Sequence, residues 1–277
     1  MFLRHRAFGQ VDHRPYPAVA RPWAVSMVWR DLAFLHWPIA PDPMRAALPD
    51  GFEPDLFEGE AWLGVVPFVM DAVRPRLCPA VPQWMAPVSV SRFPELNVRT
   101  YVRHRGEPGV LFFSLDAASR WFVRAGRLQR VGVPGLSRPG LSLPGFALPY
   151  FHAAMSVTVD DSPEGWTHYT SVRDHSGAPP ACFTGRYRPL PGSVPTPATP
   201  GTLEHFLTER YRLYSVDACG RTLVGEVHHA AWPLQPAECA LEACAMMDGI
   251  ALTLPEVPPI AHVAKRVEVV GWRPRLV

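Results

Sequence analysis

The stretch FPELNVRTY, residues 93–101, is the part of the sequence on which the predicted fold depends. In an extended strand, successive side chains point to opposite faces. One face would then carry Glu95, Asn97, Arg99 and Tyr101. The other face would carry Leu96, Val98 and Thr100. The pattern predicts a strand, and it raises the question of whether the polar face meets solvent or lines a site.

Strand signals recur through most of the chain, as segments rich in aromatic and β-branched residues that end at Gly, Pro and Asp turns. The predicted strands are WAVSMVWRDL (23–32), AWLGVVPFVM (61–70), LNVRTYVRH (96–104), GVLFFSLDA (109–117), AAMSVTVDD (153–161), WTHYTSVRD (166–174), CFTGRYRP (182–189), TLVGEVHHA (222–230) and VAKRVEVVGW (263–272). Short turns such as RHRGEPG and DDSPEG favour an antiparallel, meandering sheet. Closure of so many strands would remove exposed edges and create an interior that can hold a ligand.

Helices are expected to be short, because the 33 prolines remove backbone donors and interrupt helical turns. The predicted helices are PMRAAL (43–48), LEHFLTERYRLY (203–214) and AECALEACAMM (237–247). Asp42 before Pro43, Thr202 and Pro236 provide the start signals, and Gly249 would end the third helix. We therefore predict a mainly β protein of the α+β class, an antiparallel β-cone or barrel with a few short peripheral helices.

The length of 277 residues fits one large β-rich domain or two modest ones. Residues 131–145, VGVPGLSRPGLSLPG, are predicted to be an inserted surface loop because of their Pro and Gly density. Residues 189–201, PLPGSVPTPATPG, are predicted to be a stiff connection into the next helix. The part that follows is too short for a domain of its own, so we expect a single domain over residues 1–277.

Charge and composition exclude several classes of protein. The net charge of +2 gives no reason to expect a nucleic-acid partner, which usually requires a basic face. Lys265 is the only lysine among the 27 basic residues, and a Schiff base requires a primary amine. Lys265 would therefore have to supply any such chemistry. The sequence has no GxGxxG, P-loop or GxSxG motif, so no nucleotide cofactor is expected.

The five cysteines are odd in number and form no CxxC pair, so reduced thiols and no metal site are expected. The N-terminal stretch MFLRHRAFGQVDHRPYP lacks the apolar run of a signal peptide. The longest apolar segment, AWLGVVPFVM, is much shorter than the roughly 20 residues of a membrane helix. We expect a soluble cytoplasmic protein with no membrane partner.

Several phrases of the sequence occur together and in order between Trp29 and Trp232. They are WRDLAFLHWPI, LPDGFEPDLFEGEAWLGVVPF, FPELNVRTYV with GEPGVLFFSLDA, ALPYFHAAM, and TLEHFLTERYRLY with HHAAWPL. With these phrases the chain resembles the YqjF-like family of uncharacterised conserved bacterial proteins. The resemblance implies a scaffold similar to acetoacetate decarboxylase, a β-rich cone or barrel with a small interior cavity, but it implies no established reaction.

The resemblance also suggests roles for particular residues. FPELNVRTYV is placed like the decarboxylase strand that bears a cavity carboxylate, so Glu95 resembles that carboxylate. In ALPYFHA, Tyr150 and Phe151 stand where the decarboxylase pattern has two lysines. Lys265 lies in the alternating strand VAKRVEVV, where an exposed side chain is expected. Decarboxylation through a Schiff base is therefore not expected.

The polar face of residues 93–101 is the main candidate site. If it faces a closed interior, Arg99 can hold a carboxylate in a bidentate pair, and a desolvated Glu95 can have a raised pKa suited to proton transfer. Asn97 and Tyr101 would add an amide and a phenol to the binding site. The alternatives are a structural ion pair between Glu95 and Arg99, and a solvated outer surface.

Further candidate residues come from other segments. Tyr150 and His152 share one side of an extended segment and could polarise a carbonyl or move a proton, or could simply be packed with one hydrogen bond each. Arg210 aligns with an apolar stripe, so it should pair with a protein carboxylate or a ligand. His228 and His229 point to opposite sides of their strand, and either one can face the cavity.

The leading hypothesis is a protein that binds a small organic molecule, a carboxylate or keto acid, in its interior. Catalytic candidates are Glu95, Tyr150 and His152, and ligand-binding candidates are Asn97, Arg99, Tyr101, Arg210 and His228. One alternative is an enzyme of enolisation, dehydration or isomerisation with Glu95 as general base. Another is a structural or partner-binding protein. The expected partner is a small molecule, and homo-oligomer formation is left open.

Overall fold

The computed structural model describes residues 5–76, 92–127, 130–132, 142–144, 147–161 and 165–277. The predicted loop 131–145 therefore lies largely outside the described residues. Its two described ends form a short antiparallel pair, β6 (Arg130–Gly132) with β7 (Ser142–Pro144).

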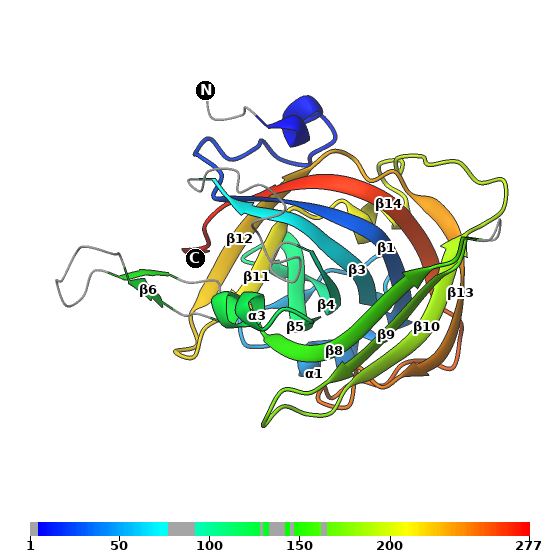
Figure 1. The fold of residues 1–277 in the computed structure, drawn as a ribbon. Helices are drawn as coiled ribbons and strands as arrows, with labels where there is room; N and C mark the ends of the chain where they lie inside the picture. Colours follow the sequence, from blue (N-terminus) through cyan, green and yellow to red (C-terminus); the bar gives the residue numbers. More distant parts are fainter. Residues whose placement is uncertain (1–4, 77–91, 128–129, 133–141, 145–146, 162–164) are drawn as a thin grey trace.

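Strands dominate the described structure (Figure 1). The remaining strands are β1 (Val25–Ile39), β2 (Glu53–Pro54), β3 (Ala61–Pro75), β4 (Phe93–His104), β5 (Glu107–Ala117), β8 (Tyr150–Val159), β9 (Thr167–Arg173), β10 (Cys182–Pro189), β11 (Arg212–Val216), β12 (Thr222–His229), β13 (Gln235–Cys244), β14 (Ile260–Gly271) and β15 (Arg275–Leu276). The helices are η1 (Arg6–Gly9), α1 (Pro41–Ala47), α3 (Arg120–Arg127) and α4 (Leu203–Thr208). Every strand that the sequence predicts is confirmed.

The helix predictions are less accurate. Residues 237–247 were predicted as a helix, and this is wrong, because residues 237–244 belong to β13 and pair with β10. The second predicted helix is too long: α4 ends at Thr208 and β11 begins at Arg212. Its start is correct, since the Thr202 side chain accepts a hydrogen bond from the backbone N–H of His205. α3 has no counterpart among the predicted helices, and α1 begins at Pro41, before the predicted start.

Two junction strands organise the sheet. β14 pairs with β1, β12 and β13, and β5 pairs with β4, β8 and β11. Within the described residues, β1, β3, β4, β5, β8, β9, β10, β13 and β14 close a nine-strand large ring. β11 and β12 connect β5 to β14 by another route and close a small ring against β1, β3 and β4 (Figure 1). The sheet is mixed rather than purely antiparallel, because β5 runs parallel to β8 and β11.

β1, β3 and β4 belong to both rings, and we call them the shared wall. Each face of the shared wall packs against its own core. The large-ring core contains Leu35, Val65, Val98, Tyr169 and Phe183. The small-ring core contains Phe34, Val66, Leu115, Val227 and Trp232. Both faces of residues 93–101 are therefore buried. The alternative that their polar face is a solvated outer surface is ruled out.

The ends of the small ring are covered by two short helices. α3 contributes Val123 and Phe122 to the small-ring core. α4 places Leu207 against Tyr101 and Trp62 at the other end of β4. The Pro-rich connection 189–201 lies beside the small ring through a bridge between Thr196 and Leu234. In the described part of the chain, no helix is long and apolar enough to cross a membrane.

Asp55 links β4 to the segment that directly follows α4. Its two carboxylate oxygens lie 2.7 Å from Arg103 Nε and 2.7 Å from Arg210 Nη1. The Asp55 and Arg210 side chains are only 5% and 9% exposed, so this pair is buried. The prediction that Arg210 has an anionic partner is confirmed, and the partner is a carboxylate of the protein itself.

We expect Asp55→Asn to lower the free energy of unfolding by about 3–5 kcal/mol, because it leaves a buried guanidinium without its counter-ion. Urea denaturation followed by circular dichroism measures the change. The matched control is Asp42→Asn, which breaks an exposed ion pair with Arg45 and should cost less than about 0.5 kcal/mol. Equal losses in the two variants would contradict a structural role for the Asp55–Arg210 pair.

Candidate functional site

Four polar side chains of β4 lie on the face of the shared wall that meets the small-ring core. They are Glu95, Asn97, Arg99 and Tyr101, and we call them the polar row. Glu95 lies opposite Phe68 and Ala117, and Asn97 lies opposite Val66 and Leu115, all of which belong to that core. Glu95, Asn97 and Tyr101 are 3%, 7% and 0% exposed. Inward-facing residues on one strand recur about every 7 Å. The row therefore presents a buried line of different hydrogen-bonding groups.

Glu95 is bound by a phenol from a distant strand. The Tyr150 hydroxyl lies 3.2 Å from both carboxyl oxygens of Glu95. Burial raises the pKa of Glu95 from an ordinary 4.5 to about 8; the hydrogen bond from Tyr150 opposes this rise, and the charge of Asp116 adds to it. Burial and the nearby Glu95 raise the pKa of Tyr150 well above its usual value. Near neutral pH both groups therefore carry their protons.

α3 holds the Tyr150 ring in place. Phe122 packs edge-on against this ring, with the centroids 5.4 Å apart. A Cβ atom on Gly126 would lie 2.3 Å from the Tyr150 ring, so only glycine leaves room at this position. Arg127 Nη1 donates a 2.6 Å hydrogen bond to the Tyr150 carbonyl. The helix that the sequence did not predict thus orients the partner of Glu95.

Arg99 is held by neutral groups. Its Nη2 donates to the Tyr101 hydroxyl at 3.2 Å and to the Leu207 carbonyl at 3.1 Å, and its guanidinium lies 5.1 Å from the centre of the Phe34 ring. The ion pairs found among the described residues include none with Arg99, so the structural Glu95–Arg99 pair is not formed. Arg99 Nε is covered and has no hydrogen-bond partner in the described structure. A bidentate pair between Arg99 and a ligand carboxylate would use Nη2. Either the Tyr101 hydroxyl or the Leu207 carbonyl would then lose its hydrogen bond.

His36 joins this network although sequence reasoning did not single it out. The Tyr101 hydroxyl donates to the Leu207 carbonyl at 2.6 Å, so His36 Nε2, 2.7 Å away, must donate to the same hydroxyl. Burial, followed by the charge of Arg99, lowers the pKa of His36 well below its ordinary value. His36 faces Gly64, and Gly64 faces Arg99, in one cross-strand row. Phe34 and His36 are two positions apart on β1 and therefore share a face. The sequence would have indicated His36 if the predicted strand had been extended beyond residue 32.

Asn97 occupies the middle of the polar row. Its amide oxygen is covered by protein, yet no described residue hydrogen-bonds to it. An unpaired buried amide is costly, because it has lost its water without gaining a partner. Asn97 therefore has a hydrogen-bonding capacity that the described structure does not use.

The structure places the other candidates outside this row. His152 contacts Asp174, whose side chain is 42% exposed, whereas Tyr150 contacts Glu95. His228 lies under the N-terminal segment, with its ring stacked on Phe8 and its Nδ1 3.0 Å from Arg14 Nη1. Burial and the charge of Arg14 lower the pKa of His228 to about 4. The opposite directions of the two histidines are confirmed, because His229 packs against Trp232 of the small-ring core.

Lys265 lies at the surface, unlike the buried polar row. Lys265 pairs with Asp31, and its side chain is 76% exposed, as the alternation of its strand predicted. Among the described residues, no group of three or more His, Cys, Asp or Glu side chains could hold a metal ion.

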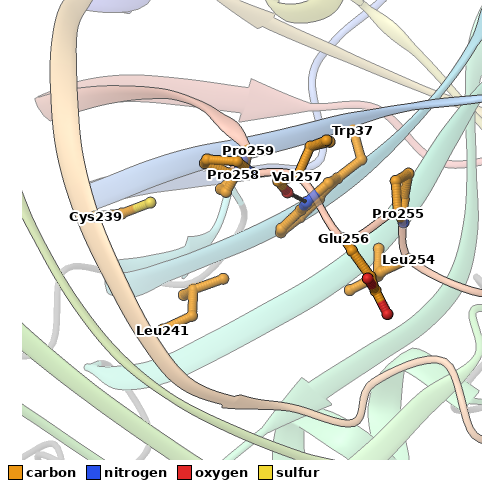
Figure 2. A pocket seen from close by; sticks show the side chains of 9 residues that line it. All are labelled: Trp37, Cys239, Leu241, Leu254, Pro255, Glu256, Val257, Pro258 and Pro259. Carbon is orange, nitrogen blue, oxygen red and sulfur yellow. Dashed lines mark hydrogen bonds between the residues drawn. The ribbon is translucent and has the colours of Figure 1, made fainter.

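A separate pocket of about 310 Å³ lies between β13 and the loop before β14 (Figure 2). Trp37, Cys239, Leu241 and residues 254–259 line it, and Trp37 Nε1 donates to the Val257 carbonyl at 3.0 Å. Its lining is mainly apolar and includes no residue of the polar row.

Comparison with known proteins relates the whole arrangement to a family. Residues 26–133 and 143–268 match the profile of DUF2071, described as an uncharacterized conserved protein. The uncharacterized protein YqjF of Bacillus subtilis (strain 168) is 35% identical over 250 residues, which cover 90% of this chain and 91% of that protein.

Solved structures share the fold at low sequence identity. The enduracididine biosynthesis enzyme MppR, complexed with pyruvate, has a TM-score of 0.59 and 13% identity, covering 94% of this chain and 92% of that one. An acetoacetate decarboxylase-like enzyme from Sphingomonas wittichii RW1 has a TM-score of 0.56 and 12% identity, covering 95% and 96%. The acetoacetate decarboxylase of Legionella pneumophila has a TM-score of 0.54 and 12% identity, covering 98% and 93%.

The raised pKa of Glu95 predicts a pH-dependent stability. Between about pH 4.5 and about pH 8 the folded protein keeps a proton that the unfolded chain has released, so this group makes stability fall as the pH rises. The slope from one proton is about 1.4 kcal/mol per pH unit. We expect Glu95→Gln to remove this decrease, as measured by urea denaturation from pH 5 to pH 9. The control is Glu53→Gln, which changes an exposed residue; a Glu95→Gln curve parallel to the wild type would contradict the assignment.

Proposed function

The chain belongs to the DUF2071 family of uncharacterized conserved proteins and has an acetoacetate decarboxylase-like fold, and on this basis we propose that it binds a small carbonyl-containing carboxylate, such as a keto acid. The binding site is the polar row of β4 inside the small ring, with Tyr150 as its partner from β8. Glu95 and Tyr150 bind the carbonyl end, and Arg99 supplies the positive charge for the carboxylate.

The observation that carries this proposal is the buried pair of Glu95 and Tyr150. A carboxylic acid that stays protonated near neutral pH can donate a hydrogen bond to a carbonyl oxygen, which an ionised carboxylate cannot do. Ionisable groups with strongly shifted pKa values are concentrated at functional sites. A structural glutamate on a buried strand would instead be expected to pair with a cation, as Asp55 does with Arg210.

The keto acid class is supported by related structures and by charge. MppR, which shares the fold, is complexed with pyruvate in one structure and with a condensation product of pyruvate in another. In this chain the Arg99 guanidinium lies against Phe34 of the small-ring core, its Nε is unpaired, and it has no carboxylate partner among the described residues. An anionic group of a ligand would neutralise this charge.

An enzyme without a Schiff base is the second candidate, favoured by the pKa of Glu95 at about 8. A group that titrates near the working pH is suited to general acid–base catalysis. Once ionised, Glu95 would take up a proton from the carbon next to the carbonyl, and the Tyr150 hydroxyl would stabilise the resulting enolate oxygen by donating a hydrogen bond to it. Lys265 does not support the Schiff-base alternative, because its side chain is exposed at the surface and paired with Asp31.

We expect pyruvate or acetoacetate to raise the melting temperature of the protein, because a ligand that binds only the folded state stabilises it by mass action. Tyr150→Phe should weaken this shift, and Glu53→Gln, at an exposed position, should leave it unchanged. Glu95→Gln should retain binding, since the amide still offers a donor, and should abolish any exchange of the α-protons with deuterated water. Exchange in the wild-type protein should rise through about pH 8.

Two outcomes would contradict the proposal. If no small carbonyl carboxylate shifts the melting temperature, the polar row is not a ligand site. If borohydride reduction with acetoacetate forms a covalent adduct, the protein uses an amine and the acid–base assignment of Glu95 and Tyr150 is wrong.

A further inference from the structure

Three neighbouring positions of the polar row each leave one hydrogen-bonding group unused, and the groups differ in kind. Their order along β4 is an O–H donor at Glu95, an acceptor at Asn97 and a charged N–H donor at Arg99. A ligand that satisfies all three must carry matching groups in the matching order. The order of these donors and acceptors therefore restricts the ligand more closely than the class of carbonyl-containing carboxylates does.

The first position follows from a count of protons. With Glu95 and Tyr150 both protonated, the pair has two O–H donors, and the contact between them uses one. The remaining O–H needs an acceptor. The cross-strand neighbours of Glu95, Phe68 and Ala117, have apolar side chains and offer none. A carbonyl oxygen of a ligand would accept this hydrogen bond.

The second position is Asn97. Its covered amide oxygen requires an N–H or O–H donor, and its cross-strand neighbours Val66 and Leu115 have apolar side chains. With 7% of its surface exposed, the side chain is too buried for bulk water to satisfy it. A ligand that is only a keto acid has no donor to offer here.

The third position is Arg99. Both hydrogens of Nη2 are used by Tyr101 and Leu207, and the covered Nε–H is unused. One carboxylate oxygen can accept from Nε without displacing either present acceptor. Arg99 is thus placed for one charge-assisted hydrogen bond rather than for the bidentate pair that the sequence suggested.

Building on the proposed function, we propose that the ligand is a carboxylate with a hydrogen-bond donor between its carboxylate and its carbonyl, as in an N-acylated amino acid. Its acyl oxygen accepts from the Glu95–Tyr150 pair, its amide N–H donates to Asn97 Oδ1, and its carboxylate accepts from Arg99 Nε. Asn97 is then the residue that makes the protein prefer N-acylated amino acids to simple keto acids.

Three probes of nearly equal shape test this inference. N-acetylglycine, levulinate and O-acetylglycolate differ in one group, which is N–H, CH2 and O respectively. Calorimetric titration should show N-acetylglycine binding at least about tenfold more tightly than levulinate, because levulinate leaves the buried amide oxygen of Asn97 unpaired. O-acetylglycolate should bind most weakly, since its oxygen would face the amide oxygen of Asn97.

Variants separate a binding role of Asn97 from a structural one. Asn97→Leu should bring the N-acetylglycine to levulinate ratio close to one and should raise the melting temperature of the ligand-free protein, because it removes an unpaired buried amide. The matched control is Ser114→Ala. Ser114 Oγ is also covered and unpartnered, but Ser114 pairs with Val98 on the large-ring face, so the ratio should stay unchanged.

The possible failures are distinguishable. Equal affinities for N-acetylglycine and levulinate in the wild-type protein would overturn the donor requirement and leave the proposed function standing. A preference that persists in Asn97→Leu would overturn the role of Asn97. Absence of binding by all three probes, and by pyruvate and acetoacetate, would overturn both proposals.

Discussion

The burial of the shared wall on both faces is the constraint on which the rest of the structure depends. β1, β3 and β4 separate two cores, so the polar groups in the buried part of these strands cannot rely on bulk water. Thr100 meets this demand through the Trp62 carbonyl at 2.9 Å, and Tyr101 meets it through the Leu207 carbonyl. The closed rings, the two covering helices and the polar row all follow from the need to enclose this wall.

Buried carboxyl groups near the shared wall are stabilised in different ways, and the difference distinguishes the candidate site at Glu95. Asp116 accepts two 2.8 Å hydrogen bonds from Arg173, and this ion pair is buried beside the large-ring core. Glu95 is equally buried, but its partner is a phenol and it keeps its proton. A pair of opposite charges is complete in itself, whereas a protonated acid beside a phenol retains a donor. Chemistry is therefore more readily expected at Glu95 than at Asp116.

The sequence predicted the elements with a strong local pattern and missed those that depend on their neighbours. The strands that were predicted are all present in the structure, because alternation is a property of the backbone that any extended segment shows. AECALEAC contains good helix formers, yet it forms most of β13, since the edge of β10 provides backbone partners there. α3 was missed, although it carries the glycine that accommodates Tyr150.

By itself, the sequence determined that Glu95, Asn97, Arg99 and Tyr101 share a face, because that depends on local backbone geometry alone. It also determined that the single amine lies elsewhere, on an alternating strand. Only the tertiary structure decided that both faces are buried and which groups meet. Parallel pairing of β5 with β8 sets Leu115 opposite Tyr150 and brings a phenol from 55 positions away to Glu95. Such partners depend on strand order, which arises from the sum of many long-range pairings and is not encoded in any one segment.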